Sequence, residues 1–360
     1  MQVKQSEEFW NKSYFQTSKH FEKNIKNISG IFVAFNTNLD AIKYVDSTLL
    51  NFLDIGKFAA KDDCREIHKL DDFKTGLLSS MESGKAMEWQ IKDSKTYNYL
   101  LDNIKFNTHR IGGQAGIVSN VLAHIGMKNI VVFNPGCSEA EADMYDSRIS
   151  SPKFSGNSLR LIPANDAYSV HDTPKINFIF EFDKGLKIRS GNKTFTVPRK
   201  NRFIVSSRPK GRDPFFPEQI LHAHNFSSFF KNIKRVFLSG YQYLSTDKQF
   251  FMAKIQLAFI RKTNPDMKIH YEFTSEENLK NVARIIKYIL PEVDSLGCNE
   301  RETCILLDAA GKKNLADTIR DSAYSAAELF EGVRFLKNMA GLKRMHVHNI
   351  DYMLCLADKG

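Results

Sequence analysis

A glycine-rich corner at residues 110–126 constrains this chain more than any other stretch. Gly112 and Gly113 stand where an extended segment gives way to a helix, and Gln114 follows them. Two adjacent glycines let the backbone approach a ligand closely, and the first N–H groups of the helix then face that ligand unpaired. Apolar residues recur at helical spacing until Gly126 ends the helix. The corner predicts either a site for an oxygen-rich, often anionic ligand or a tight turn needed only for packing.

Short apolar runs alternate with helical patterns along much of the chain. Residues 31–35, 129–134, 234–240 and 267–273 are typical of buried strands, whereas 247–264 and 276–290 are typical of helices. An earlier helix is predicted over residues 6–29, with its apolar face packed on the chain that follows. The alternation predicts an α/β fold with a largely parallel sheet that is covered by helices on both faces.

Two segments depart from this alternation. Residues 43–108 are polar and broken by glycines, which is consistent with an inserted lid. Residues 175–182 and 187–197 read as strands joined by a turn at 183–185, so a β-hairpin of an antiparallel lid is predicted there. The cations at 199–208 that follow could hold a phosphate or could simply be exposed.

Charge and cysteine content narrow the classes of function. The 360 residues hold 51 Lys and Arg against 41 Asp and Glu, a net charge of +10 that suits phosphorylated ligands or a Lys-rich surface. Because no basic block carries interleaved aromatic residues, nucleic acid is not an expected partner. The five cysteines form no CxxC pair, and no segment reads as a secretory leader or a membrane span. These features favour a cytoplasmic protein without membrane partners.

Three pairs of polar residues could line one pocket, and the first two lie just after a predicted strand or at its carboxyl end, where open α/β sheets bind their ligands. Asn38 and Asp40 are placed to hold hydroxyl groups, although an Asx turn explains them equally well. His270 and Glu272 share one face of a strand, and Asn299 and Glu302 share one face of a helix start. Taken singly, His270 is more often an interior histidine and Glu302 a surface residue. Together their carboxylates indicate a Mg²⁺ site beside nucleotide phosphates.

The motifs match a known family in combination. They are N-x-N-x-D at 36–40, G-K-x-x-E at 84–88, G-G-Q-A-G at 112–116, H-x-E at 270–272 and N-x-x-E at 299–302. With them the chain resembles, over nearly its whole length, the ADP-dependent phosphofructokinase and glucokinase family of the ribokinase-like superfamily. The resemblance implies a ribokinase-like three-layer sandwich with a mainly parallel sheet, plus a small α/β lid domain. The large domain would comprise 1–38, 110–170 and 212–360, and the lid 39–109 and 171–211.

The resemblance also implies roles for individual residues. The residues expected to contact sugar hydroxyls are Asn38, Asp40, Gly112, Gly113 and Gln114. Lys175 and Arg202 belong to lid segments similar to the phosphofructokinase branch, where cations hold the 6-phosphate. Glu88 matches a glutamate that glucose-accepting members use. Glu272 and Glu302 would organise Mg²⁺ through water, supported by His270 and Asn299.

The implied reaction moves the β-phosphoryl group of ADP to fructose 6-phosphate and releases AMP and fructose 1,6-bisphosphate, with glucose as a possible second acceptor. The expected partners are these small molecules, and the expected state is a monomer or a small homo-oligomer. Phosphoryl transfer of this kind depends mainly on positioning and on a metal clamp.

One family feature is missing from the 360 residues. The family places its catalytic aspartate in a C-terminal G-x-G-D turn, and no such turn occurs here, while Asp213 and Asp358 lack the required context. No catalytic residue is therefore assigned. The expectation is a kinase incomplete at its C-terminus, with little or no turnover by these residues alone. The alternative is a noncatalytic sugar-phosphate or nucleotide-binding protein that lacks the base.

Overall fold

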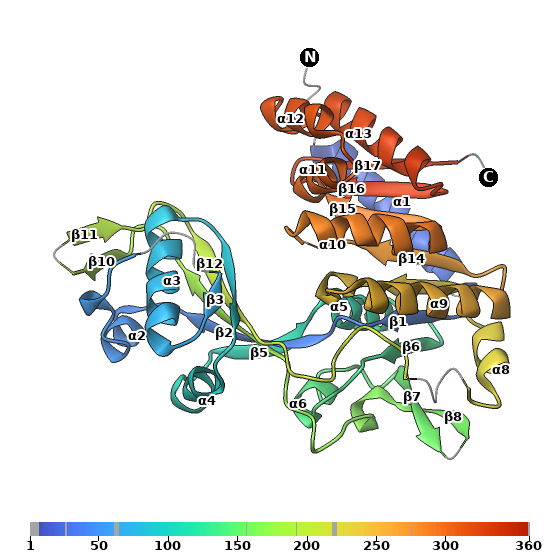
Figure 1. Cartoon of the computed structure of the whole chain (residues 1–360), viewed down its shortest axis with the longest axis horizontal. Coiled ribbons are helices and arrows are strands. Elements are labelled where there is room, and N and C mark those ends of the chain that lie inside the picture. The colour runs from blue at the N-terminus through green and yellow to red at the C-terminus, as the bar shows by residue number, and fades with distance from the viewer. Residues whose placement is uncertain are drawn as a thin grey trace.

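The chain forms a large and a small lobe, each built on its own β-sheet (Figure 1). The computed structural model describes residues 7–25, 27–60, 65–155, 157–191, 193–217, 222–274 and 276–358. Within these ranges every helix is too short or too polar to cross a bilayer.

The large lobe contains a nine-stranded sheet in the order β17-β16-β15-β14-β13-β1-β6-β7-β8. Neighbouring strands from β16 to β7 are parallel, and only the edge strands β17 and β8 are antiparallel to their partners. The mainly parallel sheet predicted from the sequence is thus confirmed. Its strands are β1 (Ile31–Ala34), β6 (Ile130–Phe133), β7 (Ile149–Ser155), β8 (Ser158–Pro163), β13 (Arg235–Leu238), β14 (Lys268–Glu272), β15 (Ser295–Asn299), β16 (Arg344–His348) and β17 (Met353–Ala357).

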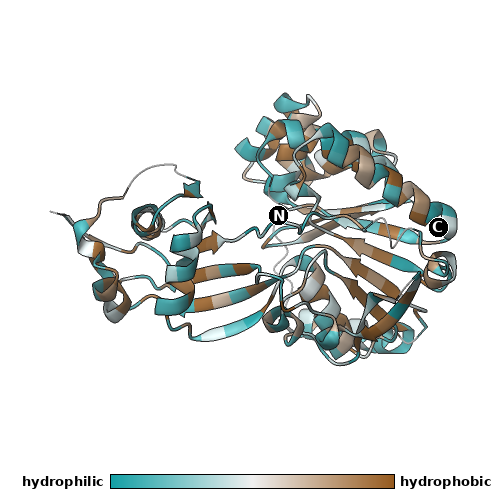
Figure 2. Ribbon diagram, turned by 60° about the horizontal axis from the view of Figure 1, so that its bottom comes forward, coloured by the Kyte–Doolittle hydropathy of each residue, from teal (hydrophilic) through white to brown (hydrophobic). Residues whose placement is uncertain are grey.

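Helices lie on both faces of this sheet and make three layers, as predicted. Alternate residues of β1 point to opposite faces: Phe32 and Ala34 join the core under one helix layer, and Val33 joins the core under the other. The first layer contains α8 (Phe226–Lys231), α9 (Asp247–Thr263), α10 (Leu279–Arg284), α11 (Glu300–Ala309), α12 (Lys313–Asp321) and α13 (Ala326–Met339). The second contains α1 (Glu7–Ile25), α5 (Gln114–His124) and α6 (Glu139–Ala142). Figure 2 shows mostly hydrophobic strands between the helix layers.

The N-terminal helix only partly meets its prediction. α1 begins and ends near the expected residues, and Ile25 at its end is buried against the sheet. Phe9, Trp10, Tyr14 and Phe15 remain exposed, so the apolar face is not packed along its length. The helical spacing was correct, but no part of the described chain lies opposite the first two turns.

The small lobe contains a six-stranded mixed sheet in the order β3-β4-β12-β9-β2-β5. Its outer face packs on helices α2 (Ser47–Phe52), α3 (Leu70–Ser83) and α4 (Ser94–Asn103), with Phe73 against Phe180 at a ring distance of 4.9 Å. The opposite face turns toward the large lobe. The strands are β2 (Asn38–Tyr44), β3 (Glu66–Ile67), β4 (Met87–Ile91), β5 (Thr108–Gly112), β9 (Ile176–Phe182) and β12 (Asn201–Ser206).

The hairpin predicted over 175–197 is wrong. β9 pairs with β2 in parallel and with β12 in antiparallel, whereas β10 (Lys187–Ser190) and β11 (Lys193–Thr196) pair only with each other. β9 is almost continuously buried, so it occupies a central position that needs a partner on each edge. The second run folds back on itself at Gly191, whose φ of +59° suits a tight turn.

Candidate active site

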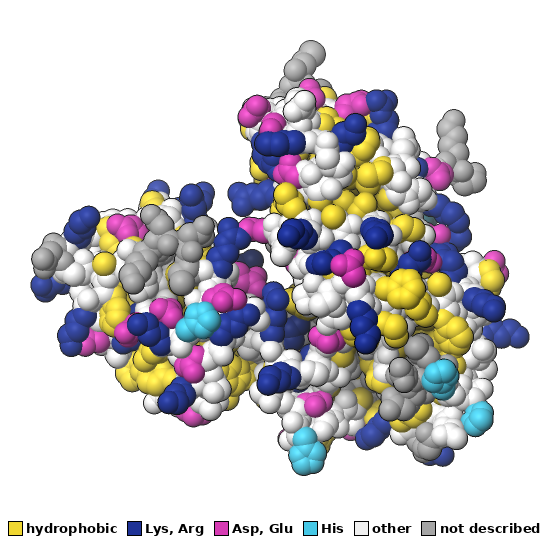
Figure 3. All heavy atoms as spheres, in the orientation of Figure 1, with side chains coloured by type: hydrophobic (Ala, Val, Ile, Leu, Met, Phe, Trp, Pro, Cys, Tyr) yellow, Lys and Arg dark blue, Asp and Glu magenta, His cyan; other side chains and the backbone are white. Residues whose placement is uncertain are grey.

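A cleft of about 300 Å³ lies between the two lobes, at the carboxyl ends of the large-sheet strands. Figure 3 shows the hollow between the lobes with basic and acidic side chains gathered around it. The small sheet contributes Asn38, Asp40, Glu88, Arg110, Asn177, Ile179, Arg202 and Ile204. The remaining lining residues are Asn36, Gly113, Gln114, Arg208, Gln242, Tyr243, Thr274 and Glu302.

Asp40 lies at the centre of the small-sheet side. Asn38 and Asp40 share one face of β2, so the predicted alternative of an Asx turn is wrong. The Asn38 amide donates to Asp40 Oδ1 at 2.7 Å, and Arg110 Nε lies 4.0 Å from Asp40 Oδ2. Burial raises the pKa of the Asp40 carboxyl, against the opposing effects of Asn38 and Arg110. The half-buried carboxylate is thus held in place and can accept hydrogen bonds from hydroxyl groups.

The glycine corner serves both packing and access. β5 ends at Gly112, and Gly113 has a φ of +71° before α5 begins at Gln114. A Cβ at Gly112 would overlap the side chains of Asn38 and Asp40, and one at Gly113 would overlap the Asn36 backbone. The packing reading is confirmed, and because the same packing brings the start of α5 to the cleft, a ligand site there stays a prediction.

A basic group lies behind and beside this corner. Lys175 Nζ donates to Asn36 Oδ1 at 2.6 Å and lies 4.5 Å from the centre of the Tyr243 ring. The Arg208 guanidinium lies over the same ring at 4.4 Å. Burial lowers the pKa of Lys175 to about 7. An anion bound nearby would therefore favour the protonated amine.

Glu302 faces the cleft from the start of α11. Asn299 is the N-cap of this helix: its side chain accepts from the Glu302 N–H at 2.9 Å, and Glu302 Oε2 accepts from the Asn299 N–H at 2.7 Å. This reciprocal capping box fixes the buried glutamate at the end of β15. Asn299 therefore positions Glu302 and does not itself line the cleft.

His270 and Glu272 point from the same face of β14, as their spacing predicts, but neither lines the cleft. His270 Nε2 lies 3.1 Å from Glu272 Oε2. Glu272 ends β14, and Glu302 lies in the first turn of α11 just after β15, so both residues lie at the carboxyl ends of neighbouring strands. Glu302 lines the cleft, whereas Glu272 does not.

The structure brings most of the predicted residues to one place. Those that line the cleft are Asn38, Asp40, Glu88, Gly113, Gln114, Arg202 and Glu302. Those that stand directly behind its wall are Gly112, beside Asp40, and Lys175, beside Asn36. Asn299, His270 and Glu272 do not line the cleft: Asn299 ends β15, whereas His270 and Glu272 of β14 are paired with Ser295 and Gly297 of β15.

Sequence reasoning missed several lining residues. Gln242 and Tyr243 follow strand β13, and Thr274 follows β14, so the rule that ligands bind beyond strand ends could have identified them. Gln242 Oε1 and Thr274 Oγ1 are buried and have no hydrogen-bond partner in the described part of the chain. Buried polar atoms of this kind are normally satisfied, so they are available to a ligand.

Comparison with known proteins identifies the family. The model of the "ADP-specific Phosphofructokinase/Glucokinase conserved region" matches residues 29–360. An ADP-specific phosphofructokinase of Methanosarcina acetivorans is 30% identical, and the match covers 98% of this chain and 75% of the relative. An ADP-dependent glucose/glucosamine kinase of Pyrococcus furiosus is 27% identical, with 97% of this chain and 77% of the relative covered.

Solved structures agree with this match. An ADP-dependent kinase complexed with fructose-6-phosphate and ADPbetaS superposes with a TM-score of 0.82 at 31% identity, covering 100% of this chain and 75% of the other. The last common ancestor of ADP-dependent phosphofructokinases from Methanosarcinales gives a TM-score of 0.80 at 32% identity, covering 99% and 76%.

Proposed function

The chain belongs to the ADP-specific phosphofructokinase/glucokinase family, and we propose that it transfers the β-phosphoryl group of ADP to fructose 6-phosphate. The products are AMP and fructose 1,6-bisphosphate. One observation carries this proposal: a single cleft holds a hydroxyl-binding carboxylate, Asp40, two cations for a phosphate, Arg202 and Arg208, and a carboxylate on the nucleotide side, Glu302.

The sugar phosphate would bind against the inner face of the small sheet. Asn38 and Asp40 offer an amide and a carboxylate to hydroxyl groups, and Gln114 adds a second amide at the start of α5. Arg202 and Arg208 are suited to a phosphate because a guanidinium can donate two parallel hydrogen bonds. Lys175 supports this end, since a nearby phosphate would stabilise its protonated form.

The small sheet would act as a lid. We assign residues 39–109 and 171–211 to this lid and 1–38, 110–170 and 212–360 to the large domain. The small sheet, which draws on residues 38–112 and 176–206, supports this division except at residues 38 and 110–112, which belong to strands β2 and β5 of that sheet. Closure would exclude water and align the donor with the acceptor, which is the main source of catalysis in phosphoryl transfer.

Glu302 and Glu272 would hold Mg²⁺ through water. The donor set fits this ion, since both are carboxylates held at neighbouring strand ends, Glu302 by its capping box and Glu272 beside His270. Mg²⁺ bound with ADP neutralises charge on the phosphates. His270 and Asn299 would position the two glutamates.

Glucose is a second candidate acceptor because of Glu88. Its side chain enters the cleft from β4, among residues otherwise suited to hydroxyl groups. A hexose without phosphate would use Glu88 in place of the cations. An E88Q variant should therefore lose activity with glucose and retain it with fructose 6-phosphate.

A coupled assay for AMP tests the proposal on the protein made from its complete coding sequence. We expect turnover with ADP and fructose 6-phosphate, and at least about 100-fold less with ATP. Comparable rates with ATP would contradict the proposal. If calorimetry shows that fructose 6-phosphate binds but the assay detects no AMP, the result would instead support the noncatalytic binding protein. The carboxylates that line the described cleft, Asp40, Glu88 and Glu302, would then serve only to recognise the ligand.

A further inference from the structure

Three side chains converge on the face of the large sheet opposite α9 and α11. His270 and Glu272 lie on β14, and His346 lies on β16. Their nitrogen and oxygen atoms all lie within 4.8 Å of one another. Glu272 Oε2 is 3.1 Å from His270 Nε2 and 3.9 Å from His346 Nε2. Two imidazoles thus face Glu272 Oε2, and a third, that of the more exposed His348, lies with its Nδ1 3.9 Å from Glu272 Oε1.

The intervening strand leaves room for this convergence. β15 runs between β14 and β16, and its Gly297 is paired with Glu272 on one side and His346 on the other. A Cβ at Gly297 would overlap the Glu272 carboxylate and lie 2.7 Å from His346 Cε1. Any larger residue would push the ligand atoms apart, so the glycine opens a hollow across three strands.

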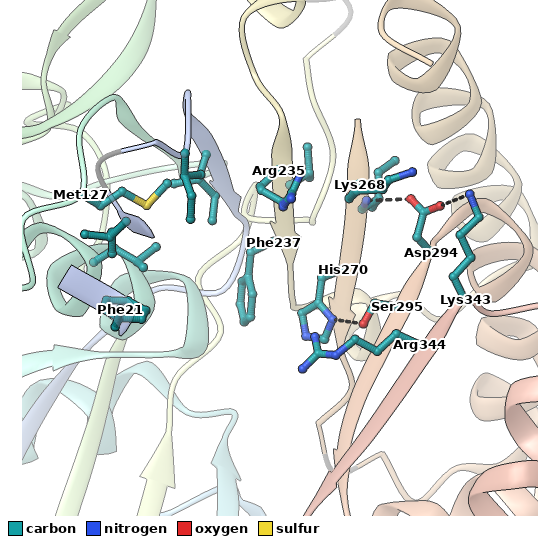
Figure 4. A pocket seen from close by; sticks show the side chains of 16 residues that line it. Phe21, Met127, Arg235, Phe237, Lys268, His270, Asp294, Ser295, Lys343 and Arg344 are labelled. Atoms are coloured by element: carbon teal, nitrogen blue, oxygen red, sulfur yellow. Dashed lines mark hydrogen bonds and ion pairs between the residues drawn. The ribbon is translucent and has the colours of Figure 1, made fainter. Parts of the chain in front are cut away.

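The two histidines are oriented so that they can act as ligands. His270 Nδ1 is hydrogen-bonded to Ser295 Oγ at 2.9 Å (Figure 4), and its Nε2 lies 3.1 Å from Glu272 Oε2. This is how a neighbouring group typically orients a metal-binding imidazole. His346 Nδ1 is buried and has no partner among the described residues.

The cluster is shielded but can be reached from solvent. The side chains of His270, Glu272 and His346 are 17%, 15% and 17% exposed. His270 also borders a cavity of about 490 Å³ on this face of the sheet, beside Arg344 and Phe237 (Figure 4). An ion therefore has a path to the cluster that does not pass through the cleft.

We propose that His270, Glu272 and His346 bind one divalent transition-metal ion, with Zn²⁺ as the best match. Two imidazoles and a carboxylate with a fourth position for water are a typical zinc ligand set. Ligand atoms about 2 Å from one tetrahedral ion stand about 3.3 Å apart. The 3.1 Å and 3.9 Å separations need only small side-chain rotations to reach this value. Mg²⁺ prefers oxygen ligands and would not use the two imidazoles.

This site shares Glu272 with the proposed Mg²⁺ site. Zn²⁺ held by the histidines would withdraw Glu272 from Mg²⁺, so zinc would oppose the binding of Mg²⁺ with ADP. This consequence rests on the proposed function, whereas zinc binding itself does not. Measuring zinc binding without nucleotide therefore separates failure of one proposal from failure of the other.

The test is titration of the metal-free protein with Zn²⁺ by calorimetry, together with the visible absorption spectrum of the Co²⁺ form. We expect one ion per chain and a tetrahedral Co²⁺ spectrum. H346A and H346Q should each weaken Zn²⁺ binding by more than about 100-fold, and S295A, which removes only the orienting hydroxyl, by about 10-fold. The matched control is H124A, which removes a histidine at the end of α5, outside the cluster.

Several results would overturn the proposal. They are absence of Zn²⁺ binding by the wild-type protein, unchanged affinity in both His346 variants, and equal weakening by H124A. Circular dichroism and the urea midpoint of each variant check folding. H346Q retains most of the side-chain volume, so weak binding by a folded H346Q protein reports the lost ligand and not a lost fold.

Discussion

Replacing Arg212 by methionine should destabilise the protein strongly, because it would leave a buried carboxylate without its cation. Arg212 forms two hydrogen bonds with Glu141, at 2.7 and 2.9 Å, and donates to the Thr173 carbonyl at 2.5 Å. The two side chains are only 9% and 0% exposed. Thr173 and Arg212 belong to the two segments that connect β9 and β12 to the large lobe. The pair therefore ties both connections to α6.

The expected loss follows from what remains around Glu141. Removing one partner of a buried ion pair costs about 3–5 kcal/mol. Glu141 Oε2 would still accept from the Ser138 N–H at 3.0 Å and from its hydroxyl at 2.7 Å, which offsets part of the cost. We therefore expect the lower end of the range, about 3 kcal/mol, for R212M. Adding E141Q should recover part of this loss, because the buried charge is then removed.

Urea unfolding followed by circular dichroism measures the effect. The control is R148M, which breaks the exposed ion pair of Arg148 with Asp146 and should leave the unfolding midpoint unchanged. If R212M unfolds at the same urea concentration as R148M, or if E141Q makes the double variant less stable than R212M alone, the reasoning is refuted.

Three further predictions concern the cleft. Burial lowers the pKa of Lys175 from 10.5 to about 7 in the folded protein. Between about pH 7 and pH 10.5 the Lys175 amine is therefore protonated in the unfolded chain but not in the folded one. In this pH range the free energy of unfolding should rise with pH by up to about 1.4 kcal/mol per pH unit. Urea unfolding at several pH values should show that K175M lacks this rise. D40N should lower kcat/KM for fructose 6-phosphate by roughly 100-fold or more. It should not lower the urea midpoint of unfolding, since burial already disfavours the charged form of the Asp40 carboxyl. An unchanged kcat/KM would exclude Asp40 from substrate binding. G112A should weaken fructose 6-phosphate binding by calorimetry at least about 10-fold, because its Cβ would displace Asn38 and Asp40, whereas G56A, whose Cβ meets only a carbonyl at 3.7 Å, should bind normally.

Local sequence patterns were sufficient to predict features that lie within one strand or helix or at its end. The alternation of strands and helices predicted the parallel sheet, and the strand-end rule placed Asn38 and Asp40 at a cleft. The spacing of Asn299 and Glu302 correctly predicted a shared helix start, which the structure shows to be a capping box. These features depend on residues within a few positions of one another.

Pairing between distant segments could not be predicted in the same way. The turn at 183–185 favours a local hairpin, yet β9 pairs with β2 and β12 on its two edges. This arrangement is more stable than the hairpin because it buries the apolar residues of β9. The contact of Arg212 with Glu141, 71 positions apart, likewise has no local signal. The approach of His346 to Glu272 depends on a glycine in the strand between them.

The sequence by itself determined the periodicity of the elements, the glycine corner and the family motifs, because each arises from residues close together in the chain. Only the tertiary structure decided which strands are neighbours, which side chains share the cleft and how Glu272 lies between His270 and His346. The physical reason is that a buried strand needs a hydrogen-bonding partner along each edge, and a buried charge needs an opposite charge or a hydrogen bond. That partner is selected by packing in three dimensions and not by distance along the chain.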